Sequence, residues 1–242
     1  MPIRIVSDER AAELKAASHD WASVTLAGRA FADAEMILLG GYAPLTGYMT
    51  REEVESVSKE RALPGGHPWP APLTLSVSDG VKVGDRVALR DGEGVMIAAL
   101  TVEDAWDEDG RRFAGGPLEA LVRPVHYDFR TLRPSADEVR HALSMKGWRR
   151  TLAWHPVGVV HRAEREDLLQ AAQRARANLL IHPPVGGAAA DDLAHYGRVR
   201  ALRVALDQFS ATSAHLALLP HMPLEDGASE ALMRGIIAKN HG

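Results

Sequence analysis

The chain has 242 residues, no cysteine and a formal net charge of -4 from 28 basic and 32 acidic residues. The lack of cysteine excludes disulfides and thiolate chemistry, and the acidic balance provides no broad cationic surface for nucleic acid or anionic lipid. Hydrophobic residues make up 46% of the chain, yet no apolar run reaches the length of a signal peptide or a membrane span. We therefore expect a soluble, cytoplasmic protein with one large or two modest domains and no nucleic-acid or membrane partner.

The first half of the chain is expected to be rich in β-strands. Between about Thr25 and Tyr127, short β-like runs alternate with turn signals that contain glycine, which is the pattern of hairpins. The expected strands are 35–39, 73–77, 86–89 and 95–102. The turn signals are Gly40-Gly41, Pro64-Gly65-Gly66, Asp79-Gly80, Asp91-Gly92 and Asp109-Gly110. This pattern predicts a small β-rich barrel or sandwich.

After Pro134 the pattern changes to helices that alternate with apolar strands. Ser135 is expected to cap a helix that reaches Met145, with acidic residues in its first turn where the helix dipole favours anions. The next elements are expected to be a strand at 150–154, a helix at 162–176, a strand at 178–181, a helix at 191–209, a strand at 214–219 and a helix at 229–239. Strands separated by helices of this length predict βαβ units and a parallel sheet.

Ligands of an open parallel sheet bind beyond the carboxyl ends of its strands, so the segments 155–164, 182–187 and 220–228 are the places to look. The first segment enters a helix at His161 and Arg162. Backbone N–H groups at a helix start, together with a neighbouring histidine and arginine, suit a phosphate group. An ordinary loop in which His161 and Arg162 are merely solvated is the alternative interpretation.

A series of landmarks, in one order along nearly the whole chain, resembles the ATP sulfurylase family. Residues 42–49, Y-A-P-L-T-G-Y-M, are similar to that family's signature F-x-P-L-x-G-F-M. Further similar segments are 84–89, 127–129 with Arg133, 147–149, 179–186, 195–200 and 236–242. The resemblance implies an N-terminal PUA-like β domain over residues 1–134. It also implies a truncated Rossmann-like nucleotidyltransferase α/β domain over residues 135–242.

The catalytic loop of that family reads Q-T-R-N-P-x-H-R-A-H, and only its H-R-A core, at 161–163, is retained here. Alignment on this core places His155, Val157, Gly158 and Glu164 at the positions of Gln, Arg, Asn and the second His. In the family, the Gln and Arg are associated with sulfate, and the Asn and both His with the phosphates of ATP. A hydrogen bond to a charged group is worth about 1.5–3 kcal/mol, so Val157 alone is expected to weaken dianion binding roughly 10–150-fold.

The resemblance implies Mg-ATP as the nucleotide and a small-molecule acceptor as the second substrate. The expected catalytic residues are His161, Arg162, His155 and Glu164. The expected nucleotide-binding residues are Gly158, His161, Arg162, His182, Val185 and Gly186. The last three would act through backbone N–H groups of the 182–187 loop, for which a simple rigid turn is the alternative.

Eleven histidines raise the question of a metal site. His155, His161, Glu164, His182 and His195 could converge at one sheet edge, and neutral imidazole with carboxylate suits Zn²⁺ or Fe²⁺. No pair of histidines has the close helical spacing of a metal motif, so no protein-ligated metal is expected.

The C-terminal landmarks are also altered relative to the family. The stretch 220–231 lacks both arginines of P-L-x-M-R-x-A-G-P-R-E-A, and a G-R-D-H-A-G loop would follow 240–242. The sheet would then have an exposed edge, which proteins usually pair or cover. We therefore expect a homodimer or a covered edge near residues 229–242.

Three functional hypotheses follow. The first is a nucleotidyltransferase in which an acceptor oxyanion attacks the α-phosphate of ATP and pyrophosphate leaves, with His161 and Arg162 stabilising charge on the phosphates. The second is a non-catalytic homologue that binds a nucleotide, a small ligand or a partner protein. The third is a reused pocket in which His155, His161 and Glu164 act as acid and base groups.

Overall fold

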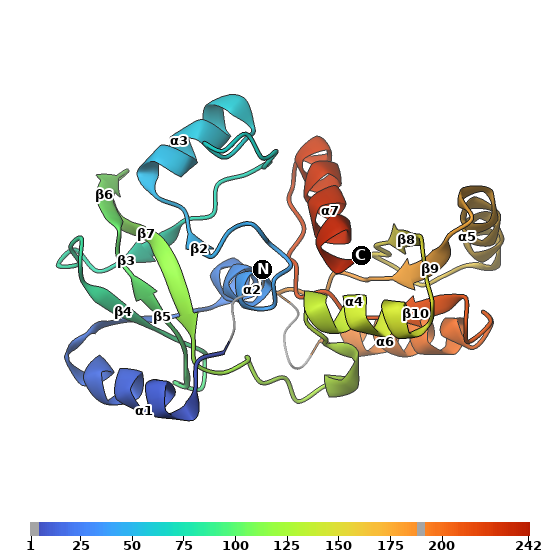
Figure 1. Ribbon diagram of the computed structural model, residues 1–242, viewed down its shortest axis with the longest axis horizontal. Coiled ribbons are helices and arrows are strands. Elements are labelled where there is room, and N and C mark those ends of the chain that lie inside the picture. Colours follow the sequence, from blue (N-terminus) through green and yellow to red (C-terminus); the bar gives the residue numbers. More distant parts are fainter. Residues whose placement is uncertain (1–4, 188–191) are drawn as a thin grey trace. The chain divides into compact units, whose positions relative to one another are not determined.

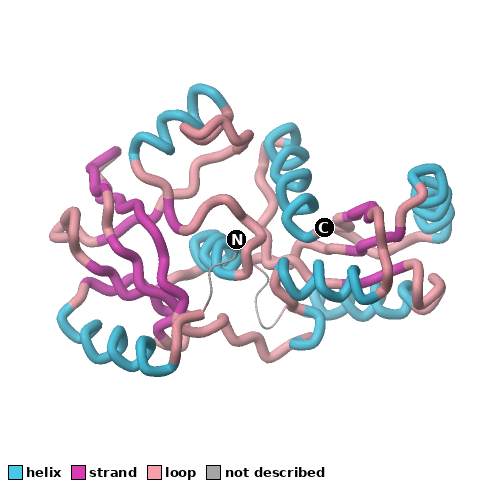
Figure 2. The backbone as a smooth tube through the Cα atoms, in the orientation of Figure 1, coloured by secondary structure: helices cyan, strands magenta, loops and turns pink. Residues whose placement is uncertain are grey.

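A computed structural model describes residues 5–187 and 192–242, and Figures 1 and 2 trace its elements. The chain forms two compact units. One contains the residues up to 125 together with 224–237, and the other contains 126–223 together with 238–242. The domain boundary expected between 134 and 135 stays a prediction.

The first unit is built on a mixed sheet in the order β1-β4-β5-β7-β2, with β3 and β6 also paired to β7. Its strands are β1 (Ala22–Thr25), β2 (Gly47–Tyr48), β3 (Leu75–Val77), β4 (Arg86–Arg90), β5 (Met96–Thr101), β6 (Asp104–Glu108) and β7 (Arg111–Ala120). The first half of β7 pairs with β3 and β6, and its second half pairs with β5. One long strand thus joins both parts of the sheet.

Two of the expected hairpins are confirmed. Asp91-Gly92 joins β4 to β5, and the Asp91 carboxylate accepts backbone N–H groups from Glu93 and Val95 at 3.0 and 2.8 Å. Asp109-Gly110 joins β6 to β7 with φ of 49° and 72°, which is the left-handed pair that a tight two-residue turn requires. Asp79-Gly80 does not close a hairpin, because β3 pairs with β7 and not with β4.

Three helices that the β-rich pattern did not predict accompany the sheet. They are α1 (Asp8–Ala17), α2 (Gly28–Leu38) and α3 (Arg51–Glu60). The strand expected at 35–39 lies almost wholly in α2, where Met36, Ile37 and Leu38 are all buried. A short apolar run does not distinguish a buried helix from a buried strand.

The second unit contains the expected parallel sheet, in the order β10-β9-β8. Its strands are β8 (Thr151–Trp154), β9 (Asn178–Ile181) and β10 (Ala214–Leu216). Trp154 and Leu216 are both in register with Ile181, so the three strands end at one edge. The strand expected at 214–219 is shorter than predicted, although a bridge between Pro184 and Leu219 continues the pairing.

Helices cover both faces of this sheet. On one face, α4 (Ala136–Met145) packs Val139 and Leu143 against Leu180 and Ala217. Leu179 and Ile181 point to the other face, which α5 (Arg162–Ala175) and α6 (Leu193–Leu206) cover. Ser135 caps α4 as expected, through a capping box with Glu138. The last helix, α7 (Gly227–His241), confirms the helix expected at 229–239.

Among the described residues, none of the helices combines the length and the apolar character that a membrane crossing requires.

The glycine of the 42–49 segment has a steric role. Gly47 in β2 lies so close to β7 that a Cβ atom there would sit 1.9 Å from the carbonyl oxygen of Gly116. Gly116 has a φ of 146°, and a Cβ atom there would lie 2.1 Å from the carbonyl oxygen of Thr101. Backbone therefore surrounds both glycines, and a side chain at Gly47 could be accommodated only by displacing backbone.

We expect Gly47→Ala to destabilise the first unit by about 3 kcal/mol or more, because the added carbon collides with backbone. Urea unfolding followed by circular dichroism measures this loss. Gly80→Ala is the matched control, because a Cβ at Gly80 meets nothing within 4 Å. Equal stability of the two variants would contradict the close approach of β2 and β7.

Candidate functional site

The loop from β8 to α5 lies at the carboxyl edge of the parallel sheet. His155 follows the last residue of β8, and His182 follows the last residue of β9. Since these strands are in register, the two imidazole rings stack with centroids 5.7 Å apart. The structure therefore brings together two of the predicted site residues.

His161, Arg162 and Glu164 all lie exposed at the start of α5. His161 precedes the first helical residue, and its backbone N–H donates to the Glu164 carboxylate at 3.1 Å. The Arg162 Nε donates to Glu166 at 3.0 Å, and the Arg162 side chain is 88% exposed. An exposed pair of this kind contributes at most about 1 kcal/mol, so a ligand anion can displace Glu166 from the guanidinium.

Backbone hydrogen bonds to neighbouring segments hold the 182–187 loop in place. The N–H groups of His182, Val185 and Gly186 donate to the carbonyl oxygens of Trp154, Leu219 and His221, at 2.7, 2.8 and 3.0 Å. The expectation that these N–H groups face a ligand is therefore wrong, and the alternative of a rigid turn describes them. Assignment of the three residues to a nucleotide site stays a prediction.

Arg198 ties the two loops together. Its guanidinium donates to the carbonyl oxygens of Val157 and Pro184, both at 3.2 Å, from the second turn of α6. One side chain thus fixes the backbone of the 155–161 loop relative to that of the 182–187 loop.

A buried charged cluster anchors the start of α6. His195 Nε2 lies 2.8 Å from the Asp128 carboxylate, which also accepts from Arg133 at 2.9 Å. Burial opposes ionisation of Asp128, but the hydrogen bonds from His195 and Arg133 outweigh it and lower the pKa of this carboxyl. Asp128 and Arg133 belong to one landmark of the sequence, and His195 belongs to another, 195–200. Their positions in the sequence do not predict that they meet.

His182 is almost completely buried, with 1% of its surface exposed, and it also packs edge-on against His241 at 4.6 Å. Burial, followed by the nearby imidazoles of His241 and His155, lowers the pKa of His182 well below its usual range. Within residues 5–187 and 192–242, no group of three histidine, aspartate or glutamate side chains is arranged to hold a metal ion.

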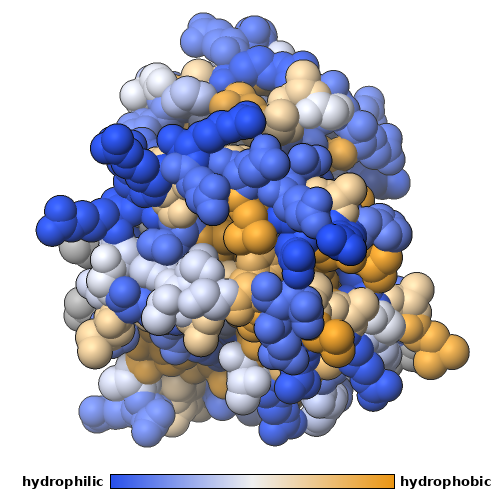
Figure 3. All heavy atoms as spheres, turned by 90° about the vertical axis from the view of Figure 1, so that its right-hand side faces the viewer, coloured by the Kyte–Doolittle hydropathy of each residue, from blue (hydrophilic) through white to orange (hydrophobic). Residues whose placement is uncertain are grey.

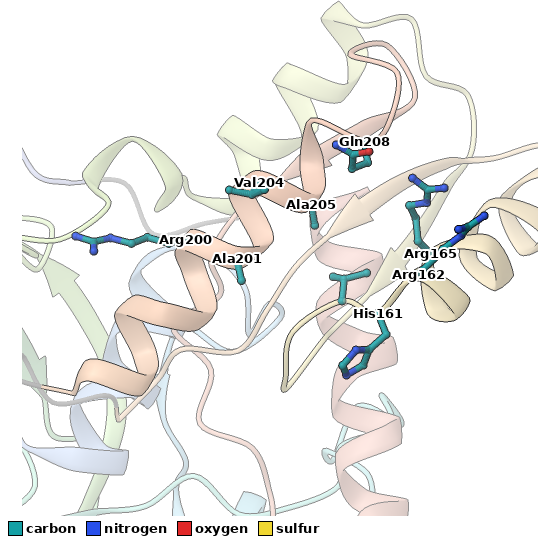
Figure 4. A pocket seen from close by; sticks show the side chains of 9 residues that line it. His161, Arg162, Arg165, Arg200, Ala201, Val204, Ala205 and Gln208 are labelled. Carbon is teal, nitrogen blue, oxygen red and sulfur yellow. The ribbon is translucent and has the colours of Figure 1, made fainter.

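A cavity of about 790 Å³ opens between the start of α5 and the second half of α6 (Figure 4). His161 and Arg162 line it, and so does Arg165, one turn further along α5. His155, Gly158 and Glu164 are not among the lining residues. The cavity thus joins part of the predicted site to a helix face that the sequence did not indicate.

Comparisons with known proteins match both halves of the chain. Residues 1–115 match the PUA-like domain, and residues 130–242 match the ATP-sulfurylase domain. The sulfate adenylyltransferases of Neurospora crassa and Schizosaccharomyces pombe are each 36% identical to it, over 96% and 90% of the chain. The chain belongs to the ATP sulfurylase family. The family and the PUA-like nature of the first part, both predicted from the ordered landmarks, are confirmed.

This ATP sulfurylase homologue spans about half the length of the curated relatives that it matches, 46% of the first and 51% of the second. A solved structure described as a hexameric APS kinase from Thiobacillus denitrificans is 37% identical to it, with a TM-score of 0.91. The match covers 100% of this chain and 50% of that one. The fold of the chain is therefore shared with a longer protein.

We expect the free energy of unfolding to fall as the pH is lowered from 7.5 to 5.5. The pKa of His182 is depressed in the folded chain, whereas an unfolded histidine takes up a proton near pH 6.5. Below that pH the unfolded state binds the proton more readily, so acid favours unfolding by up to about 1.4 kcal/mol per pH unit. Urea unfolding at each pH, followed by tryptophan fluorescence, measures the slope.

His182→Gln should flatten this pH dependence, because it removes the buried base. His67→Gln is the control, since His67 is exposed in the first unit. An unchanged slope in His182→Gln would assign the acid sensitivity to another group.

Proposed function

We propose that the second unit carries an ATP sulfurylase-type nucleotide site at the carboxyl edge of β8, β9 and β10. The observation that supports this most is the loop from β8 into α5, which presents His161 and Arg162 at a helix start in a family fold. A helix start of this kind attracts phosphate through its free N–H groups and its dipole. We also propose that residues 135–242 form a Rossmann-like nucleotidyltransferase domain.

The proposed reaction is adenylyl transfer from Mg-ATP. An oxygen of an anionic acceptor attacks the α-phosphorus, the bond from that phosphorus to the bridging oxygen breaks, and pyrophosphate leaves. His161 and Arg162 would stabilise the charge that builds up on the phosphate oxygens. Gly158, with no side chain in an exposed loop, lets the phosphates approach the backbone. The Glu164 carboxylate would contribute to nucleotide binding only by holding Mg²⁺ against the phosphates of ATP.

We propose further that inorganic sulfate is a poor acceptor. Val157 is 64% exposed at the position where the family has the arginine associated with sulfate. An aliphatic side chain offers a dianion no hydrogen bond. His155, which stacks on His182, therefore has no cationic side chain at position 157 to bind sulfate together with it. The acceptor is then an oxyanion other than sulfate.

A second candidate function is a non-catalytic homologue that binds a nucleotide, a small ligand or a partner protein. Two observations favour it. The Glu164 carboxylate already caps the helix start that a phosphate would use, and the N–H groups of Val185 and Gly186 are already bonded to carbonyl oxygens. Both features stabilise the site without ligand and leave fewer groups to bind one.

We also propose that the chain is cytoplasmic and self-associates, as a homodimer in the simplest case. Within the described residues, β8 and β10 each pair only with β9, so neither edge of the parallel sheet has a further strand beside it. Light scattering of the purified chain tests this assembly, and a monomer at all concentrations would contradict it.

Calorimetric titration with Mg-ATP measures whether the chain binds the nucleotide and how tightly. We expect the double variant His161→Ala with Arg162→Gln to weaken Mg-ATP binding at least tenfold, because two charge-assisted contacts are lost. Arg174→Gln, an exposed change in the last turn of α5, is the control. Equal binding by both variants would place the nucleotide elsewhere.

Pyrophosphate release tests the reaction. We expect no sulfate-dependent release from the unaltered chain. Val157→Arg should raise its sulfate affinity roughly tenfold or more, because one charged hydrogen bond is restored. Release with another oxyanion acceptor supports the transferase, whereas ATP binding without release with any acceptor supports the non-catalytic homologue.

A further inference from the structure

The cavity between α5 and α6 has an apolar wall. Ala201 and Ala205 are one turn apart on α6 and face α5 (Figure 4). Val160, in the 155–161 loop, also lines the cavity. Val204 is 65% exposed, which is unusual for a large aliphatic side chain on a helix with a buried face. On the side of the molecule that carries α5, apolar patches are visible among hydrophilic side chains (Figure 3).

The opposite side of the cavity is cationic. Arg162 and Arg165 lie side by side on α5, whereas the side chain of Arg200 extends away from α5 (Figure 4). The Nε atom of Arg165 is buried and, among the described residues, has no hydrogen-bond partner. None of the nine lining residues is acidic. The cavity therefore holds a cationic donor that lacks the acceptor which a buried N–H group requires.

The shape of the apolar wall restricts the ligand. Two alanines at i and i+4 leave a flat ledge level with the helix surface, on which a planar ring can lie. Gln208, two residues beyond the end of α6, adds an amide that both donates and accepts hydrogen bonds. A volume of about 790 Å³ lies within the roughly 300–1,000 Å³ that is usual for small-molecule sites.

We propose that this cavity binds an anionic small molecule with a flat aromatic or heteroaromatic body. Its phosphate or carboxylate group lies on Arg162 and Arg165, and its ring lies on Ala201 and Ala205. A bare phosphate would leave the apolar wall in water, and an uncharged ring would leave the Nε of Arg165 without an acceptor. The site shares Arg162 with the proposed function and rests on it in that residue, but it requires binding alone and adds the facing sides of α5 and α6, which adenylyl transfer does not use.

Calorimetric titration of the full chain at low ionic strength tests this site with three probes. Adenosine monophosphate carries both the ring and the anion, adenosine carries only the ring with its sugar, and inorganic phosphate carries only the anion. We expect adenosine monophosphate to bind at least tenfold more tightly than either of the others. Binding of adenosine monophosphate no tighter than that of phosphate would overturn the proposal.

Matched variants locate the ligand. Arg165→Gln should weaken binding of adenosine monophosphate at least fivefold, whereas Arg174→Gln on the same helix should leave it unchanged. Ala205→Trp should abolish binding by filling the ledge, and Ala171→Trp, at an exposed position of α5, should not.

Unchanged binding by a folded Ala205→Trp variant would assign the ligand to the 155–161 loop and overturn the proposal. If Ala205→Trp does not fold, the comparison of Arg165→Gln with Arg174→Gln decides, because neither change adds bulk. Pyrophosphate release plays no part in these measurements, so failure of adenylyl transfer does not affect the result.

Discussion

The parallel register of β8, β9 and β10 is the constraint on which the candidate site depends. Because all three strands run in one direction and end level with one another, the loops that follow them share one edge. His155 and His182, 27 residues apart in the sequence, stack for this reason alone. Arg198 then bonds the backbones of both loops, so the edge is fixed from the α6 side as well.

The start of α5 shows how a stabilising contact and a binding function compete for the same atoms. A helix start has free N–H groups that either an internal carboxylate or an external phosphate can satisfy. In this chain Glu164 stands where the family has a histidine, and its carboxylate takes the N–H of His161. The substitution therefore stabilises the helix and, through its charge, would oppose a phosphate bound there as proposed. In the proposed function, the change at Val157 in the same loop would likewise weaken binding, in this case that of the acceptor.

The first unit depends on a different constraint, the close approach of backbone to backbone. Gly47 and Gly116 meet where β2 pairs with β7, and a Cβ atom at Gly115 would lie 2.1 Å from the carbonyl oxygen of Met49. The absence of side chains at these three positions lets one strand pair with partners on both of its halves. The glycine within the 42–49 landmark is thus explained by packing and needs no role in binding.

The sequence by itself determined the family, the parallel sheet and the start of α5. These features rest on local order: capping residues such as Ser135, strands separated by helices, and landmarks in one succession. It did not determine α2, because a short apolar run such as Met36 to Leu39 fits a buried helix and a buried strand alike.

Only the tertiary structure decided which distant residues meet. Asp128 and His195 are 67 residues apart, and His182 and His241 are 59 residues apart. The cavity between α5 and α6 likewise joins residues from 160–165 to residues from 200–208. Helical and strand periodicity describe neighbours along one element and carry no information on such pairs. The physical reason is that these contacts are set by how helices pack on the sheet, which depends on the whole second unit at once.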